Sequence, residues 1–197
     1  INNAAHVTRN KDFIVTDILT LTSGRLKLNN GLVELLNPAP AALVVTGGRI
    51  QGETDIIANN VAPYGQFHWP MGSAAGLRVI PFANSNGFDI PLDYNITAGN
   101  HDVYFSTYKT NQDNTNIPGP EVTNIFGPNN AVGGGAWGTG GHTMVDRFYQ
   151  INNVTPAGAT ADLAFRYAAG VVPPGEEAQA GNTNMRAQRW NNDQDRW

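Results

Sequence analysis

The titratable side chains of this sequence do not form a recognised catalytic or metal-binding motif. The chain has 197 residues, no cysteine and four histidines, which are His6, His68, His101 and His142. These histidines are far apart, without the His-x-His or His-Glu-x-x-His spacing that brings two imidazoles onto one metal ion. The lack of thiols also excludes a thiolate metal site and a disulfide framework. We therefore expect no metal and no cofactor.

Carboxylates and hydroxyls give equally little support for catalysis. Asp89 with Asp93, and Asp146 with Asp162, are candidate pairs for glycoside hydrolysis, but the required separation of ~5–10 Å is a property of the fold. No serine stands in a Gly-x-Ser-x-Gly elbow. The glycine-rich stretch 133–141 lacks the Lys-Ser/Thr ending of a phosphate loop. We predict that the chain has no catalytic residues and is not an enzyme.

Two Asn- and Asp-rich stretches place oxygen ligands at alternate positions, as calcium loops do. They are Asn111-x-Asp113-x-Thr115 and Asn191-x-Asp193-x-Asp195. Neither has the glycine and the distal glutamate that complete the recognised loop. We interpret both as solvated turns.

Three aromatic side chains are candidates for carbohydrate binding, because aromatic rings stack on the apolar faces of sugars. They are Tyr64, Trp69 and Trp137. The alternative for Phe67-His68-Trp69 is a strand that enters a hydrophobic core and ends in the turn Pro70-Met71-Gly72. The alternative is favoured, since a core of this size needs large aromatic side chains.

Arg147 is predicted to lie among apolar neighbours. If residues 144–151 form a strand, Val145, Arg147, Tyr149 and Ile151 share one face. A buried charge is costly unless it is paired. We therefore expect Arg147 to extend to a carboxylate or carbonyl group, and we expect the same of Arg49, Arg166 and Arg189.

The elements that position these residues begin with a short sequence pattern that occurs three times between Leu19 and Leu35. The apolar pairs Leu19/Leu21, Leu26/Leu28 and Val33/Leu35 each enclose one polar residue: Thr20, Lys27 or Glu34. Alternation at period two places the leucines on the inner face of strands and the polar residues on the outer face. Ser23-Gly24, Asn29-Asn30-Gly31 and Asn37-Pro38 are turn sequences. Such a chain is either a run of tight hairpins or a β-solenoid.

The composition favours an all-β protein outside the cell. Only 14% of the residues are charged, against roughly 25% in typical soluble proteins. Asn, Gly and Thr are poor helix formers that serve turns and strands. The net charge of −4 gives no basic footprint for nucleic acid or an anionic membrane. No membrane-spanning segment or signal peptide is recognised, so a secreted form would have lost its leader. We expect an extracellular, cell-surface location.

The predicted organisation is a short-strand, solenoid-like region over residues 1–60, followed by an antiparallel β-sandwich over 61–197. Composition shifts near residue 60, and the later strands are longer. Residues 144–151 and 163–167 look like paired strands around a turn at 156–158. The predicted core of the sandwich contains Phe82, Phe105, Phe148, Phe165 and Trp190.

Several motifs in fixed order resemble a module of large Bacteroidota surface proteins. The motifs are Thr46-Gly47-Gly48-Arg49-Ile50-Gln51-Gly52, Phe67-His68-Trp69-Pro70-Met71-Gly72, Arg78-Val79-Ile80-Pro81-Phe82, Val145-Asp146-Arg147-Phe148-Tyr149-Gln150-Ile151 and Ala187-Gln188-Arg189-Trp190. Such modules occur in gliding-motility adhesins and other cargo of the type IX secretion system. The resemblance implies a scaffold within a long extracellular protein and brings no catalytic residues with it. Because the family's last strand runs on into further strands, we expect this chain to be part of a longer one.

Both ends of the chain are predicted to contact a neighbouring module or subunit. The start, Ile1 to Val7, resembles a strand, and the end alternates charge and aromatic residues at Trp190 and Trp197. We predict a non-catalytic structural module of an extracellular surface protein, fibre or adhesin. Its partners would be neighbouring modules or identical subunits, and surface polysaccharide is a further candidate. The alternatives are a carbohydrate-binding module and a self-assembling filament subunit, in which the strand 1–8 completes the sheet of a neighbour.

Overall fold

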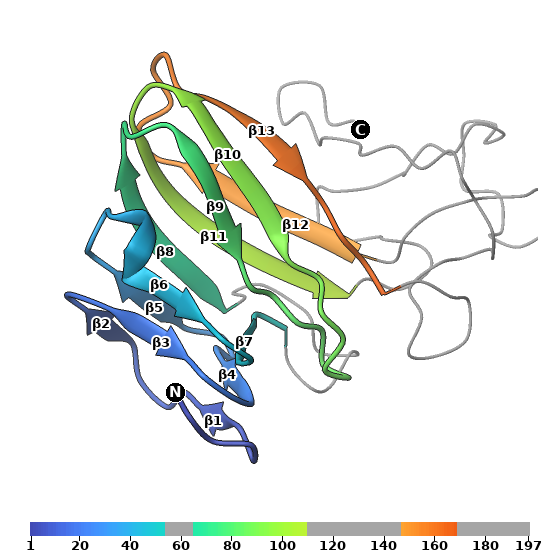
Figure 1. The fold of residues 1–197 in the computed structure, drawn as a ribbon. Helices are drawn as coiled ribbons and strands as arrows, with labels where there is room; N and C mark the ends of the chain where they lie inside the picture. Colours follow the sequence, from blue (N-terminus) through green and yellow to red (C-terminus); the bar gives the residue numbers. More distant parts are fainter. Residues whose placement is uncertain (54–64, 110–146, 169–197) are drawn as a thin grey trace, which may run out of the picture.

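Strands and turns make up nearly all of the described chain. The computed structural model describes residues 1–53, 65–109 and 147–168, shown in colour in Figure 1. Within these residues the only helical element is a single 3-10 turn, η1 (Pro40–Ala42), and none of the described helices is long or apolar enough to cross a membrane. The prediction of an all-β fold is confirmed for these ranges.

The N-terminal strands are short and pair in parallel. They are β1 (Val7–Thr8), β2 (Phe13–Val15), β3 (Leu19–Leu21), β4 (Arg25–Lys27), β5 (Leu32–Leu35), β6 (Leu43–Val45) and β7 (Arg49–Gln51). Each strand from β1 to β5 pairs with the one three places later, so that β1, β4 and β7 form one stack and β3 and β6 form another. Consecutive strands therefore lie in different sheets, and the hairpin alternative is wrong for this region.

The turns between these strands have the expected backbone geometry. Gly24 and Asn29 have positive φ values of 69° and 49°. A Cβ atom at Gly24 would lie 1.9 Å from the carbonyl oxygen of Asn3, so this turn requires glycine for space as well as for conformation.

The predicted inward face of the repeat is confirmed. All six apolar residues are buried, namely Leu19, Leu21, Leu26, Leu28, Val33 and Leu35. Thr20 between them is exposed, while Lys27 and Glu34 are half-buried. Burying one such side chain stabilises the fold by ~1.5–3 kcal/mol, which fixes which face of each strand points inward.

The later strands are longer and pair antiparallel. They are β8 (Gln66–Gly72), β9 (Gly76–Ile80), β10 (Leu92–Ala98), β11 (His101–Lys109), β12 (Arg147–Asn153) and β13 (Thr160–Ala164). One sheet has the order β12-β11-β8-β5-β2 and another has the order β13-β10-β9. Figure 1 shows β9, β10 and β13 as a layer lying over β8, β11 and β12. Strands β12 and β13 are thus in different layers, and the prediction that they pair with each other is wrong.

The parallel and antiparallel parts share sheets and core. β8 pairs in parallel with β5 and antiparallel with β11. The stack of β1, β4 and β7 continues through Ile50, whose N–H donates to Pro81 O at 2.8 Å and whose carbonyl accepts from Ala83 N at 2.8 Å. One cluster of buried side chains extends from Leu19 to Phe105. The predicted division near residue 60 therefore marks a change of pairing direction within one continuous core.

The predicted aromatic core of the second region is partly correct. Phe82 and Phe105 are fully buried, as expected. Phe165 is 39% exposed, because it follows the edge strand β13, and its ring packs against that of Tyr149. Phe148 is half-buried and stacks on Tyr108, since Tyr149 and Ile151 occupy the core-facing positions of β12. Both phenylalanine assignments are corrected, and Trp190 lies outside the described residues.

Candidate functional site

Only some of the predicted functional residues lie in the described part of the structure. Tyr64, Trp137, Trp190 and Trp197 lie outside the described residues, as do both candidate calcium stretches. Trp69 is 1% exposed, and its indole N–H donates a hydrogen bond of 2.8 Å to the carbonyl of Asn37. A buried ring has no open face for a sugar, so the assignment of Trp69 as a stacking platform is corrected in favour of the core strand.

The N-terminal segment lies against its own chain. Val7 and Thr8 pair in parallel with Leu26 and Lys27. The carbonyl of Ile1 accepts from Thr22 N at 2.7 Å, and the Ile1 side chain packs on the core. The segment therefore does not project as a free strand, and only its outer edge is open among the described residues.

Of the carboxylates considered for hydrolysis, Asp89 and Asp93 are paired with arginines, and Asp162 accepts from Asn95 Nδ2 at 3.4 Å. Arg49 Nη2 lies 2.5 Å from Asp89 Oδ2, and Arg166 Nη2 lies 2.9 Å from Asp93 Oδ2. The expectation that Arg49 and Arg166 reach carboxylates is confirmed. Asp146 and Arg189 lie outside the described residues.

A cluster of polar residues lies on the outer face of the larger sheet, around His68. Its Nδ1 is 3.1 Å from Glu34 Oε1, and its Nε2 is 2.5 Å from Asp102 Oδ1. The Tyr104 ring stacks on the imidazole, with centroids 4.0 Å apart and planes 10° apart. His68 is directly opposite Glu34 on β5 and Tyr104 on β11, so strand register assembles the cluster.

This cluster is suited to crosslinking strands. A ring nitrogen donates a hydrogen bond only when it carries a proton, so both carboxylates are satisfied at once only by the doubly protonated imidazole. Both ring nitrogens of His68 face carboxylates, and no group of three or more His, Cys, Asp or Glu side chains in the described ranges is arranged to hold a metal ion. Sequence reasoning missed this cluster, because its members come together only through the register of three strands.

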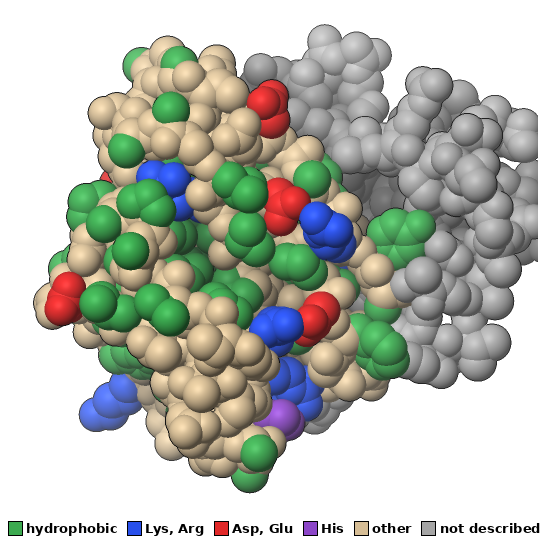
Figure 2. Space-filling model, in the orientation of Figure 1, with side chains coloured by type: hydrophobic (Ala, Val, Ile, Leu, Met, Phe, Trp, Pro, Cys, Tyr) green, Lys and Arg blue, Asp and Glu red, His purple; other side chains and the backbone are tan. Residues whose placement is uncertain are grey.

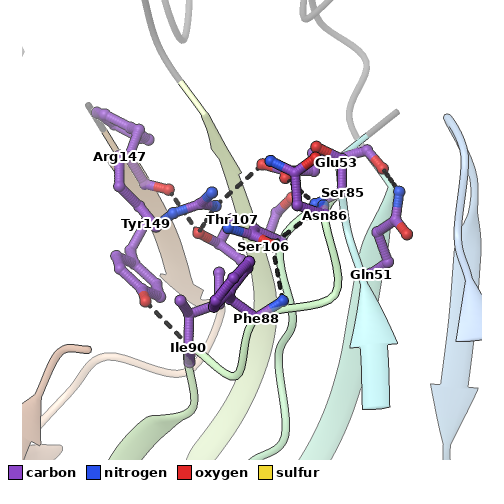
Figure 3. Close-up of polar contacts among 12 residues, drawn as sticks. Gln51, Glu53, Ser85, Asn86, Phe88, Ile90, Ser106, Thr107, Arg147 and Tyr149 are labelled. Carbon is purple, nitrogen blue, oxygen red and sulfur yellow. Dashed lines mark hydrogen bonds and ion pairs between the residues drawn. The ribbon is translucent and has the colours of Figure 1, made fainter. Parts of the chain in front are cut away.

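A second polar cluster is buried at one end of the two layers (Figure 3). Arg147 Nη1 lies 3.0 Å from Glu53 Oε2, and each side chain is 1% exposed. The same nitrogen donates to Thr107 Oγ1 at 3.1 Å. Glu53 also accepts from the backbone N–H of Ser85, and its carbonyl accepts from Gln51 Nε2 at 2.9 Å. The expectation for Arg147 is confirmed, and the network joins four segments that are far apart in sequence.

Breaking this buried pair should cost far more stability than breaking an exposed one. Glu53→Gln leaves the Arg147 cation buried without its counter-charge and is expected to cost ~3–5 kcal/mol in the free energy of unfolding. The matched control is Asp89→Asn, which removes the carboxylate of the exposed pair with Arg49 and should cost ~1 kcal/mol or less. Urea unfolding of both variants is the measurement. Equal losses would contradict the assigned difference in burial.

The titration of Tyr104 should depend on its acidic neighbours. Burial raises the pKa of Tyr104, and the charges of Glu34 and Asp102 raise it further. A raised pKa in the folded state means that the contribution of Tyr104 to stability is complete below pH 10.0, its ordinary value, and is lost as the pH rises through the folded value. Glu34→Gln should therefore lower the pKa of Tyr104.

Tyr94 is the internal control for this experiment, because burial alone raises its pKa. Site-resolved NMR of the tyrosine rings during an alkaline titration measures both groups in one sample. An unchanged Tyr104 titration in Glu34→Gln, or an equal change at Tyr94, would contradict the arrangement around His68.

Comparisons with known proteins add no relative to this description. Protein-family models, curated proteins and solved structures give no match to the chain. The functional inference therefore depends on the residues and contacts described above.

Proposed function

We propose that this chain is a non-catalytic structural module of an extracellular bacterial surface protein, fibre or adhesin. The observation that carries the proposal is the continuity of sheet and core from the parallel stacks into the antiparallel layers. We interpret the stacks as a short β-solenoid and the layers as a β-sandwich joined to it through β8 and the contact between Ile50 and Phe82. A rod with one core is suited to holding other parts of a surface protein at a distance.

The use of polar side chains supports this proposal. Charged and polar groups form pairs that fasten strands to one another: Arg147 with Glu53, His68 with Glu34 and Asp102, and Arg49 with Asp89. A low charge content with many amides and hydroxyls provides solubility, and the absence of cysteine leaves no thiol to oxidise outside the cell.

A filament subunit is the second candidate, because the solenoid-like end has open edges. In the described sheets, β1, β2 and β3 each pair on one side only. Ile14 on β2 and Ile18 beside β3 are exposed there. An unpaired strand edge with apolar side chains is a template for another strand, from a covalent neighbour or from an identical subunit.

If the parallel stacks and the antiparallel layers unfold as one cooperative unit, a destabilising substitution in the stacks must also destabilise the layers. Leu26→Ala removes a fully buried side chain from β4 and is expected to cost ~2–5 kcal/mol. The slowest-exchanging amides of β5 and β11 should lose the same amount of opening free energy in hydrogen exchange. Thr20→Ala, a substitution at an exposed position of the same repeat, should change the opening free energies of β5 and β11 by no more than ~0.5 kcal/mol. Loss of protection confined to β5 would contradict a single unit.

Assembly through the open edges can be tested separately. Sedimentation velocity and electron microscopy of the chain should show concentration-dependent end-to-end association. Ile14→Lys should reduce it, because a charge on an edge strand opposes pairing with another strand. Val154→Lys, which adds the same charge at an exposed position after β12, is the control. A stable monomer at all accessible concentrations would exclude the filament alternative and leave the structural module in place.

A further inference from the structure

An apolar groove separates the strand β6 from the strand β9. It has a volume of about 370 Å³, within the range of roughly 300–1,000 Å³ that is usual for ligand sites. Leu43 and Val45 of β6 line one side, Leu77 and Val79 of β9 line the other, and Trp69 of β8 lies between them. Figure 2 shows hydrophobic side chains gathered around this hollow.

Both strands beside the groove are edge strands of the described sheets. β6 is the last strand of the sheet β3-β6, and β9 is the last strand of the sheet β13-β10-β9. The two neighbouring stacks, β1-β4-β7 and β2-β5-β8, each have three parallel strands where this one has two. The position that a third strand would take beside β6 is thus the position of the groove.

The exposed side chains of the groove suit an extended peptide. Leu77 is 53% exposed, and Val79 and Val45 are also exposed. Apolar residues in a row along two open edges are unusual, because edge strands of natural proteins normally carry charges that block pairing. Pro81, directly after β9, has no N–H to donate and limits pairing at that end to a short segment.

Arg78 gives the groove a defined electrostatic preference. This β9 side chain lines the groove, is 2% exposed, and has a buried Nε atom without a hydrogen-bond partner. Its other nitrogens donate only to the carbonyls of Gly76, Leu77 and Ala74, at 3.2–3.3 Å. Within the described residues no carboxylate pairs with it, in contrast to Arg49 at the same groove, which holds Asp89. A buried cation with only neutral partners attracts an anionic group.

We propose that this groove binds an extended peptide from a partner protein, one that carries a carboxylate between β-branched apolar residues. The peptide backbone would add a strand beside β6, its apolar side chains would contact the exposed Val45 and Leu77, and its carboxylate would meet Arg78. The proposal goes beyond the structural module and does not depend on self-association of the chain.

The test uses a fluorescein-labelled peptide, Val-Thr-Asp-Thr-Val with blocked ends, and its Asp-to-Asn counterpart. In this sequence the first, third and fifth side chains face one way, which directs the aspartate and both valines into the groove. Fluorescence anisotropy with the full chain should show binding of the Asp peptide at least about tenfold tighter than that of the Asn peptide. Arg78→Met, which keeps the bulk of the side chain, should abolish this discrimination.

A second pair of variants keeps the test valid if Arg78→Met does not fold. Leu77→Glu places a negative charge at the exposed rim of the groove, next to Arg78, and should abolish binding of the Asp peptide. Leu163→Glu makes the same change on β13, an edge strand at the other side of the same sheet, and should leave binding unchanged.

Three results would overturn the proposal. They are equal binding of the Asp and Asn peptides, equal effects of Leu77→Glu and Leu163→Glu, and no binding up to about 1 mM peptide. Slow hydrogen exchange of the Val45 amide, which points away from β3, would also overturn it, because another part of the chain or a second copy would then cover this edge.

Discussion

The structure depends on one strand that pairs in two directions. β8 forms a parallel ladder with β5 on one edge and an antiparallel ladder with β11 on the other. Phe67, Trp69 and Met71 on its inner face are all buried in the shared core. Parallel and antiparallel ladders differ in hydrogen-bond spacing, and a strand between them must satisfy both at once. If β8 shifted by one residue, these three side chains would turn to solvent and His68 would enter the core.

The two polar clusters lie where segments distant in sequence meet. One is on the outer face of the sheet that contains β8, and the other is at one end of the two layers. The His68 cluster crosses β5, β8 and β11 on the outer face, and the pair of Arg147 with Glu53 fastens β12 to the segment after β7. Apolar packing tolerates small shifts of one strand along another, whereas a hydrogen-bonded ion pair does not. These clusters therefore add specificity to a core whose hydrophobic residues supply most of the stability.

Arg78 differs from these paired charges, because within the described residues its hydrogen-bond partners are backbone carbonyls. It is buried at the edge where the stack of β3 and β6 stops and the layer of β9, β10 and β13 begins. Where the parallel stacks give way to antiparallel pairs, the described sheets have no further strand beside β6 or β9. The groove is thus a geometric result of joining the two arrangements, and within the described residues the guanidinium that lines it has only backbone carbonyls as partners.

Local patterns in the sequence were sufficient for the strands, the turns and the inward face of the repeat. Alternation at period two depends only on neighbouring residues, which is why Leu26 and Val33 were placed correctly and why Gly24 was recognised as a turn residue. The sequence also indicated that Arg147 needs a carboxylate or carbonyl partner, because a charge on an apolar strand face is costly wherever the strand lies. It did not identify Glu53 as the partner.

Only the tertiary structure decided which strands pair, in which direction and in which register. Seven-residue spacing is compatible with hairpins and with stacked coils, since both have the same local periodicity. Phe165 was misplaced because burial depends on the position of a strand within its layer, which no local pattern encodes. The contacts of His68 with Glu34 and Asp102, and the groove between β6 and β9, arise from long-range pairing for the same physical reason.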